Sequence, residues 1–172
     1  MNSSIYVVVM GVSGCGKSTI AKGIADGLNN AVFVDGDDLH PQSNIGKMSS
    51  GIPLNDEDRW PWLDIIRNRA AETLNRQQSF VVACSSLKQA YRQQLCSDEA
   101  RGWFVYLDGS RELITQRQSA REDHFMRPSL IASQFDALEV PVDEPNVIRV
   151  SIDQTVDEVV AEALQQLRSH FQ

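Results

Sequence analysis

The chain has 172 residues, a length that fits one domain with a hydrophobic core and leaves no room for a second full one. It carries 16 Lys and Arg against 23 Asp and Glu, and this net charge of −7 argues against a nucleic-acid partner, because nucleic-acid backbones are themselves anionic. The three cysteines form no C-x-x-C pair and the apolar run near the N-terminus is too short to span a bilayer, so we expect a cytoplasmic protein without a disulfide framework, zinc site or membrane anchor.

Apolar, β-branched runs alternate along the chain with segments whose apolar residues recur at helical spacing. The predicted strands are residues 5–10, 31–34, 79–84, 103–107 and 147–150. The predicted helices are residues 18–28, 58–74 (capped by Asp58, with Pro61 in its first turn), 87–95, 112–121, 129–138 and 156–171. This alternation predicts an α/β fold with a parallel sheet of about five strands and helices on both faces. Ligands of such sheets bind beyond the carboxyl ends of the strands.

Residues 11–18 match the phosphate-loop pattern G-x-x-x-x-G-K-[ST] between a predicted strand and a predicted helix, which is the context that the motif requires. Glycines let successive backbone N–H groups turn around an anion, and the following helix adds the positive end of its dipole. We expect Lys17 to reach the β- and γ-phosphates of ATP and Ser18 to bind Mg²⁺. The predicted nucleotide-binding residues are Gly11, Val12, Ser13, Gly14, Cys15, Gly16, Lys17, Ser18 and Thr19. Together with the predicted parallel sheet, this motif predicts the three-layer fold of the P-loop NTPases.

Cys15 allows two interpretations, because it lies inside the phosphate loop and near a helix N-terminus. Such a position lowers the pKa of a thiol and makes it reactive. A small side chain that simply fills space is the interpretation that we favour, and the sequence leaves the matter open.

Asp35 and Asp37 follow the second predicted strand and are two residues apart, so on an extended chain both point to the same side. Phosphoryl transfer needs one carboxylate near Mg²⁺ and another to orient the accepting hydroxyl and take its proton. We assign Asp35 to the metal and Asp37 to the hydroxyl, although the residues do not distinguish the two roles. Without the phosphate loop, a simple turn would be the better interpretation.

Five basic residues of this acidic chain lie near predicted strand ends: Arg59, Lys88, Arg92, Arg117 and Arg121. Lys88 and Arg92 are four residues apart on one predicted helix, where they would bind a substrate carboxylate. Arg117 and Arg121 have the same spacing and would suit a lid over the phosphates of ATP, with Arg121 stabilising the transferred charge. Each of them taken alone is equally compatible with a solvated surface.

Much of the chain resembles the gluconate kinases, from the phosphate loop to about residue 141. The segments that carry the resemblance are residues 35–41, 44–48, 51–59, 61–63, 84–88, 91–92, 124–126 and 133–135. The resemblance implies a fold similar to those of shikimate and adenylate kinases. It also implies ATP-dependent phosphorylation of D-gluconate on its 6-hydroxyl, with Mg²⁺ and usually as a homodimer. A substrate-binding segment at about residues 36–75 and a lid at about residues 117–130 would complete one domain.

The resemblance also implies roles for individual residues. By analogy with shikimate kinases, Asp37 would contact the accepting hydroxyl and Arg59 the substrate, with Lys88 and Arg92 as candidates for the sugar-acid carboxylate. His40 joins the candidates for substrate contact, although we expect a structural rather than a catalytic role for it. Two residues depart from the family pattern, Asp123 in place of Gly and Cys15 in place of Ser.

Two other functions remain open at this stage. The nearest alternative is a kinase for another small hydroxylated metabolite such as shikimate or a nucleoside. A second alternative is a regulatory protein that binds ATP without transferring phosphate, although Asp37 and the basic residues on the substrate side argue against this. Gluconate is an anion like ATP, so Mg²⁺, Lys17 and the arginines would have to offset the repulsion between the two substrates.

Overall fold

The structure is a computed structural model that describes residues 4–96, 102–119 and 128–171. Five parallel strands form its centre. The strands are β1 (Tyr6–Met10), β2 (Ala31–Asp35), β3 (Ser79–Ala83), β4 (Gly102–Asp108) and β5 (Val147–Ser151). Their order in the sheet is β2-β3-β1-β4-β5. The predicted α/β class and the five-stranded parallel sheet are confirmed.

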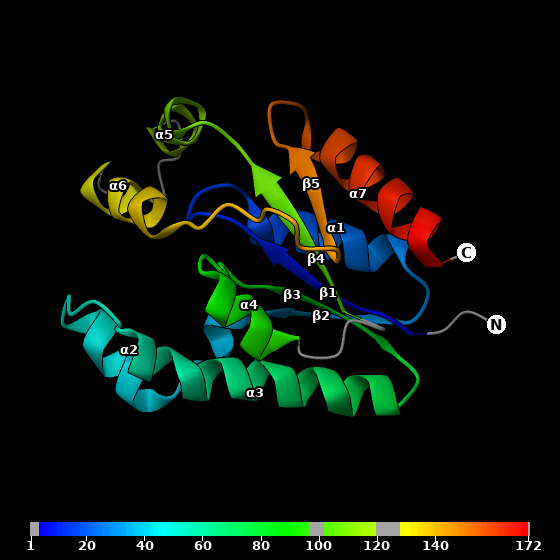
Figure 1. The fold of residues 1–172 in the computed structure, drawn as a ribbon, viewed down its shortest axis with the longest axis horizontal. Helices are drawn as coiled ribbons and strands as arrows, with labels where there is room; N and C mark the ends of the chain where they lie inside the picture. Colours follow the sequence, from blue (N-terminus) through cyan, green and yellow to red (C-terminus); the bar gives the residue numbers. More distant parts are fainter. Residues whose placement is uncertain (1–3, 97–101, 120–127, 172) are drawn as a thin grey trace.

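Helices cover both faces of this sheet (Figure 1). The helices α1 (Lys17–Gly27) and α7 (Val156–Phe171) pack on one face, and α3 (Asp56–Asn75) and α4 (Gln89–Leu95) pack on the other. Because successive strand residues point to opposite faces, Val7 and Val9 of β1 belong to the first apolar core and Tyr6 and Val8 to the second. This burial on both faces explains why the strands read as continuous apolar runs in the sequence.

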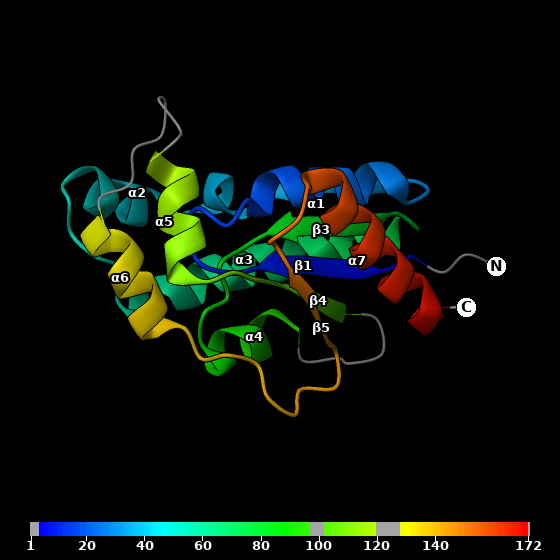
Figure 2. The same cartoon turned by 90° about the horizontal axis from the view of Figure 1, so that it is seen from above.

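The remaining helices gather around the carboxyl ends of the strands (Figures 1 and 2). They are the 3₁₀ turn η1 (Gly36–Leu39), α2 (Gln42–Ser49), α5 (Arg111–Ser119) and α6 (Pro128–Ala137). The turn η1 and α2 lie on the side of β2, whereas α5 and α6 follow β4. Among the helices that the structure describes, none combines the length and the apolar composition needed to cross a membrane.

The start of α3 differs from the prediction. Asn55, and not Asp58, is the N-cap: its side chain accepts from the backbone N–H of Asp58 at 2.8 Å, and Asp58 accepts from the N–H of Asn55 at 3.0 Å. This reciprocal capping box satisfies two N–H groups that a helix end otherwise leaves unpaired. The helix therefore begins at Asp56, and Pro61 lies inside it rather than in the first turn.

The sheet core gives a prediction for stability. Val82 of β3 has no exposed surface, whereas 71% of Val142 is exposed. Val82→Ala removes buried methyl groups and leaves a cavity, so we expect it to lower the free energy of unfolding by about 2 kcal/mol. The matched change Val142→Ala should alter it by less than about 0.5 kcal/mol. Urea unfolding of both variants tests this, and equal midpoints would contradict the assigned core.

Candidate active site

The phosphate loop connects β1 to α1 and has the backbone shape that its glycines permit. Gly14 and Gly16 have φ values of 88° and 92°, a left-handed region that side chains with a Cβ rarely adopt. A Cβ on Gly14 would also lie 2.2 Å from the side-chain nitrogen of Gln118 in α5. The Nζ of Lys17 lies 3.1 Å from the carbonyl oxygen of Val12, so the lysine reaches back over the loop. The loop thus has the form of an anion cradle with a cation above it.

Asp35, the last residue of β2, connects the second strand to the phosphate loop. Its Oδ2 accepts a hydrogen bond of 2.9 Å from the hydroxyl of Ser18, and its Oδ1 accepts one of 3.0 Å from the backbone N–H of Asp37. A hydroxyl and a carboxylate oxygen side by side are ligands that Mg²⁺ prefers. Within the described residues, no group of three or more His, Cys, Asp or Glu could hold a metal. The donor set therefore fits an ion that is held chiefly by phosphates and water.

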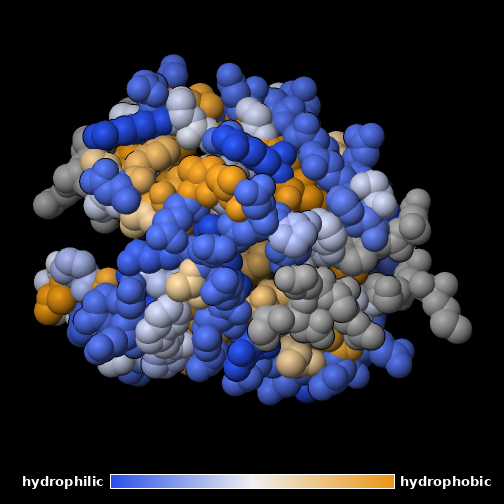
Figure 3. All heavy atoms as spheres, in the orientation of Figure 1, coloured by the Kyte–Doolittle hydropathy of each residue, from blue (hydrophilic) through white to orange (hydrophobic). Residues whose placement is uncertain are grey.

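Asp37 points into a cleft of about 720 Å³ at the carboxyl ends of the strands. The cleft is lined by the phosphate loop, the ends of β2 and β3, residues 51–54 after α2, and side chains of α5 and α6. In Figure 3 it opens at the left edge, between α2 and the region of α5 and α6. Lys17, Asp35, Asp37, His40 and Arg59 all line it, so the structure brings these predicted residues together.

The Asp37 carboxyl is open to solvent, with 87% of its side chain exposed, although protein surrounds it within the cleft. Its pKa is raised, first because the cleft partly desolvates the carboxylate and second because the Asp35 carboxylate lies nearby; Lys17 acts in the opposite direction. A raised pKa makes a carboxylate a stronger proton acceptor when it is ionised. These properties suit a group that accepts a hydroxyl proton.

A second pocket of about 420 Å³ lies against the phosphate loop and shares Gly14, Gly16 and Thr19 with the first cleft. The rest of its lining comes from α1, from Arg117 of α5 and from residues 152–159, which follow β5 and begin α7. Arg117 Nη2 lies 3.5 Å from the carbonyl oxygen of Gln154. The sequence analysis missed residues 152–156. The rule that ligands bind at strand carboxyl ends, applied to β5, would have indicated them.

Arg59 and Lys88 both lie over the ring of Tyr91, with Arg59 Cζ 5.5 Å and Lys88 Nζ 5.6 Å from its centroid. Arg59 lines the cleft, whereas Lys88 and Tyr91 lie outside its lining. Arg59 Nη1 donates to the carbonyl of Leu54 at 2.9 Å and to the hydroxyl of Tyr91 at 3.3 Å. Within the described residues its Nε and Nη2 make no hydrogen bond, so they remain available to a ligand. Lys88 is the N-cap residue of α4 and forms an ion pair of 3.1 Å with Asp56, which also accepts a hydrogen bond from Tyr91.

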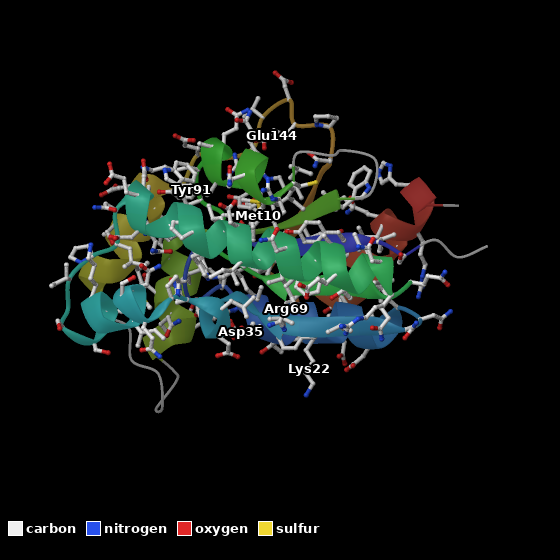
Figure 4. All side chains as sticks on the ribbon, turned by 90° about the horizontal axis from the view of Figure 1, so that it is seen from below. Met10, Lys22, Asp35, Arg69, Tyr91 and Glu144 are labelled. Atoms are coloured by element: carbon white, nitrogen blue, oxygen red, sulfur yellow. The ribbon has the colours of Figure 1, made fainter. Side chains whose placement is uncertain are left out.

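The expectation that Arg92 binds a substrate carboxylate has to be corrected. Only 2% of its side chain is exposed, and Nε and Nη2 each lie 2.8 Å from an oxygen of Glu144. Its other N–H groups donate to the carbonyls of Ser86, Leu87 and Glu139. All five donors of the guanidinium are therefore engaged. Arg92 thereby joins α4 to the segment before β5, which carries Glu144. Figure 4 shows Glu144 and Tyr91 of α4 on the same side of the molecule.

Cys15 is a buried side chain of the core next to α1, with 4% of its surface exposed. Burial raises the pKa of its thiol, an effect that Lys17 and nearby backbone N–H groups only partly offset. A thiol with a raised pKa and little access is a poor nucleophile. The structure therefore favours the interpretation of Cys15 as a residue that fills space.

Gln134 of α6 is a further residue at the site, to which the sequence analysis assigned no role although residues 133–135 carry part of the family resemblance. Its Oε1 accepts hydrogen bonds from the backbone N–H of Ser13 at 3.2 Å and from the Ser13 hydroxyl at 3.1 Å. This contact ties α6 to the phosphate loop across 121 residues of sequence. Arg121 lies outside the described residues, as do His124 and Asp123, whereas Arg117 is described and lines the second pocket.

Three comparisons relate this chain to known proteins. The model of the shikimate kinase family matches residues 13–168. The gluconokinase of Gluconobacter oxydans is 45% identical over 167 residues, which span 97% of this chain and 91% of that protein. The thermosensitive gluconokinase of Escherichia coli is 43% identical over 159 residues, spanning 92% and 84%. The crystal structure of a gluconokinase from Sinorhizobium meliloti has a TM-score of 0.88 at 42% identity and covers 99% of this chain and 95% of that one.

The engaged guanidinium of Arg92 gives the second prediction. Arg92→Met leaves Glu144 as an uncompensated and largely buried charge, so we expect the free energy of unfolding to fall by about 3–5 kcal/mol. Arg149 also pairs with a carboxylate, that of Asp108, but 59% of its side chain is exposed. Arg149→Met should therefore cost less than about 1 kcal/mol. Chemical denaturation measures both, and unchanged stability in Arg92→Met would return this residue to the ligand candidates.

Proposed function

The chain belongs to the gluconokinase family, within the wider family that the shikimate kinase model describes, and on this premise we propose that it phosphorylates D-gluconate. It transfers the γ-phosphate of ATP to the 6-hydroxyl and yields 6-phospho-D-gluconate and ADP. The observation that carries the proposal is the composition of the 720 Å³ cleft, where the phosphate-loop lysine, a carboxylate with a raised pKa and a partly unengaged arginine line one space.

ATP would bind along the phosphate loop. The N–H groups of the loop and of the first turn of α1 surround the phosphates, and Lys17 moves from the Val12 carbonyl to the β- and γ-phosphates. The second pocket, which the loop adjoins, has the position and size for the nucleoside, with Arg117 at its edge. Mg²⁺, when bound, would neutralise charge on the phosphates. Ser18 and Asp35 are the residues that would hold it.

Asp37 would orient the 6-hydroxyl and accept its proton during transfer. The accepting oxygen has to lie in line with the bond that breaks, and positioning of this kind supplies much of the rate of phosphoryl transfer. Asp35 is already engaged by Ser18 and by the backbone N–H of Asp37, whereas the Asp37 carboxylate faces the open cleft. This contrast supports the division of roles between the two carboxylates.

The substrate carboxylate would bind at the other end of the cleft. Arg59 offers Nε and Nη2 for a bidentate contact, which suits a planar carboxylate. Lys88 would assist if a carboxylate drew it from its half-exposed partner Asp56. These two cations, together with Lys17, offset the repulsion between two anionic substrates in an acidic protein. Arg92 is excluded from this role because its donors are engaged within the fold.

Four further features belong to the proposal. Residues at about 36–75 bind the sugar acid, and a lid at about 117–130, with Arg117 and Arg121, closes over the phosphates and excludes water. The protein acts as a homodimer, as the resemblance to gluconate kinases implies. It works in the cytoplasm, and the free thiols of Cys15 and Cys84 are consistent with a reducing compartment.

A panel of acceptors tests the function. Purified protein with Mg²⁺ and ATP is offered gluconate, other aldonates, shikimate and a nucleoside, and ADP release is followed with a coupled assay. We expect the highest kcat/KM with gluconate, because Arg59 and Asp37 line the same cleft and would bind its carboxylate and its far hydroxyl, respectively. Turnover on shikimate alone would defeat the proposal, and ATP binding without any acceptor-stimulated turnover would favour a regulatory protein.

The role of Asp37 gives a sharper prediction. Asp37→Asn removes the proton acceptor but keeps the size of the side chain, so kcat should fall by about 10²- to 10⁴-fold. The Kd for ATP, measured by calorimetry, should stay within about twofold, because the nucleotide is bound by other residues. Asp38→Asn, a change at the exposed neighbouring residue, is the matched control and should keep most of the activity. Near-parental turnover of Asp37→Asn would dismiss the assignment.

A further inference from the structure

His40 occupies an unusually constrained position next to the candidate active site. Its side chain is only 4% exposed and stacks on the indole of Trp62, with ring centroids 4.0 Å apart and planes 16° apart. Trp62 is held in turn by a hydrogen bond of 2.8 Å from its Nε1 to the carbonyl oxygen of Gly36. The imidazole plane is therefore set by an aromatic neighbour that is itself anchored to the first residue of η1.

The protonation pattern of this imidazole follows from Asn44 of α2, of which only 2% is exposed. Asn44 Nδ2 lies 2.9 Å from the carbonyl oxygen of Asp58, which can only accept, so this atom is the amide nitrogen. The same nitrogen lies 3.1 Å from His40 Nδ1. An amide nitrogen only donates, so Nδ1 must accept. The proton of the neutral imidazole is then on Nε2.

This Nε2–H faces the catalytic carboxylate. His40 Nε2 lies 4.0 Å from Oδ1 of Asp37. Within the described residues, the backbone N–H of Asp37 is bonded to Asp35, but no hydrogen bond holds the Asp37 carboxylate itself. A proton acceptor that is free to rotate loses much of the benefit of proximity. Hydrogen bonds at active sites are often long in the free enzyme and shorten when substrate binds.

We propose that His40 is a positioning residue for Asp37: Asn44 holds its imidazole as the Nε2–H tautomer, and this N–H orients the Asp37 carboxylate toward the accepting hydroxyl. The inference rests on the proposed phosphoryl transfer and adds two residues to it, His40 and Asn44. His40 passes no proton to the substrate. It fixes one carboxylate oxygen, so that the other is presented to the hydroxyl.

The surroundings of His40 favour a neutral ring. Burial lowers its pKa, and the nearby positive charge of Arg59 lowers it further. A neutral imidazole with its proton on Nε2 can donate to Asp37 without neutralising the negative charge that a proton acceptor needs. An imidazolium at the same place would form an ion pair with Asp37 and weaken it as a base. The site thus provides an oriented donor without a full charge.

Variants of His40 separate orientation from packing. His40→Phe keeps an aromatic ring on Trp62 but removes the donor, so kcat should fall by about 10- to 100-fold, with the KM for ATP unchanged. His40→Gln retains an N–H group at a similar reach and should recover part of the loss. His170 stacks on Trp103 at 4.3 Å, away from the cleft, so His170→Phe is the matched control and should keep the parental kcat. Parental kcat in His40→Phe would overturn the inference.

A double-mutant cycle tests whether His40 acts through Asp37. In an Asp37→Asn background there is no carboxylate to orient, so adding His40→Phe should cause less than about a twofold further loss in single-turnover rate. A full multiplicative loss would mean that His40 acts independently, and it would refute the positioning role. The melting temperatures of Asp37→Asn and the double variant are measured alongside, so that a folding defect in the double variant is recognised.

The tautomer of His40 can be determined without an activity measurement. Long-range ¹H–¹⁵N NMR of the unmodified protein distinguishes a protonated from an unprotonated ring nitrogen, and the His40 signals are assigned through nearby protons of Trp62. We expect a protonated Nε2 and an unprotonated Nδ1, and the reverse pattern would overturn the inference even if no variant folds. A parent protein that phosphorylates no acceptor would instead defeat the proposed function. The two failures are therefore distinguishable.

Discussion

The parallel pairing of β1 with β3 and β4 is the constraint on which the candidate site depends. Val9 pairs with Ala83 and Met10 with Tyr106, so the carboxyl ends of the three central strands lie at the same level. The phosphate loop leaves this edge directly and is tied to the next strand end by a hydrogen bond of 3.2 Å from Gly11 N to the carbonyl oxygen of Ser85. Because β2 pairs in the same direction with β3, Asp35 also arrives at this edge. Residues far apart in the sequence thereby share one cleft.

At this edge of the sheet, the chain after β2 can pass close to β3 only because a glycine stands there. A Cβ on Gly36 would lie 2.5 Å from the carbonyl oxygen of Ala83, so the chain can turn into η1 beside β3 only with glycine at this position. The turn is closed by Asp35, which accepts from the N–H of Asp37 and from Ser18 together. One carboxylate thus sets the backbone that carries the other. This coupling gives two acidic residues two positions apart different surroundings.

Charge in this acidic protein is distributed between binding and architecture. Lys17 and Arg59 line the cleft and retain capacity for anions, whereas Arg92 is spent entirely on Glu144 and backbone carbonyls. Breaking such a buried pair is costly because the remaining charge has no water to solvate it. Lys88 is intermediate, since it pairs with a half-exposed Asp56 and could exchange that partner for a ligand. Burial, more than the type of side chain, therefore separates structural cations from those that can bind substrate.

The sequence by itself determined the α/β class, the five strands, the phosphate loop and the family resemblance, because all of these follow from local patterns. Apolar runs and glycine spacing are properties of neighbouring residues, so Lys17, Ser18, Asp35 and Asp37 could be assigned before any contact was known. The strand boundaries differ from the predicted ones by one residue at most, whereas α3 begins two residues earlier than predicted because Asn55, and not Asp58, is its N-cap.

Only the tertiary structure decided which groups face these residues. The i, i+4 spacing of Lys88 and Arg92 suggested a shared carboxylate site, but Glu144 and the carbonyls that engage Arg92 come from other segments of the chain. The tautomer of His40 depends likewise on the amide of Asn44, whose orientation is set by a carbonyl fourteen residues further on. Hydrogen-bond partners across elements carry no periodic signal in the sequence, because they depend on how the helices dock on the sheet.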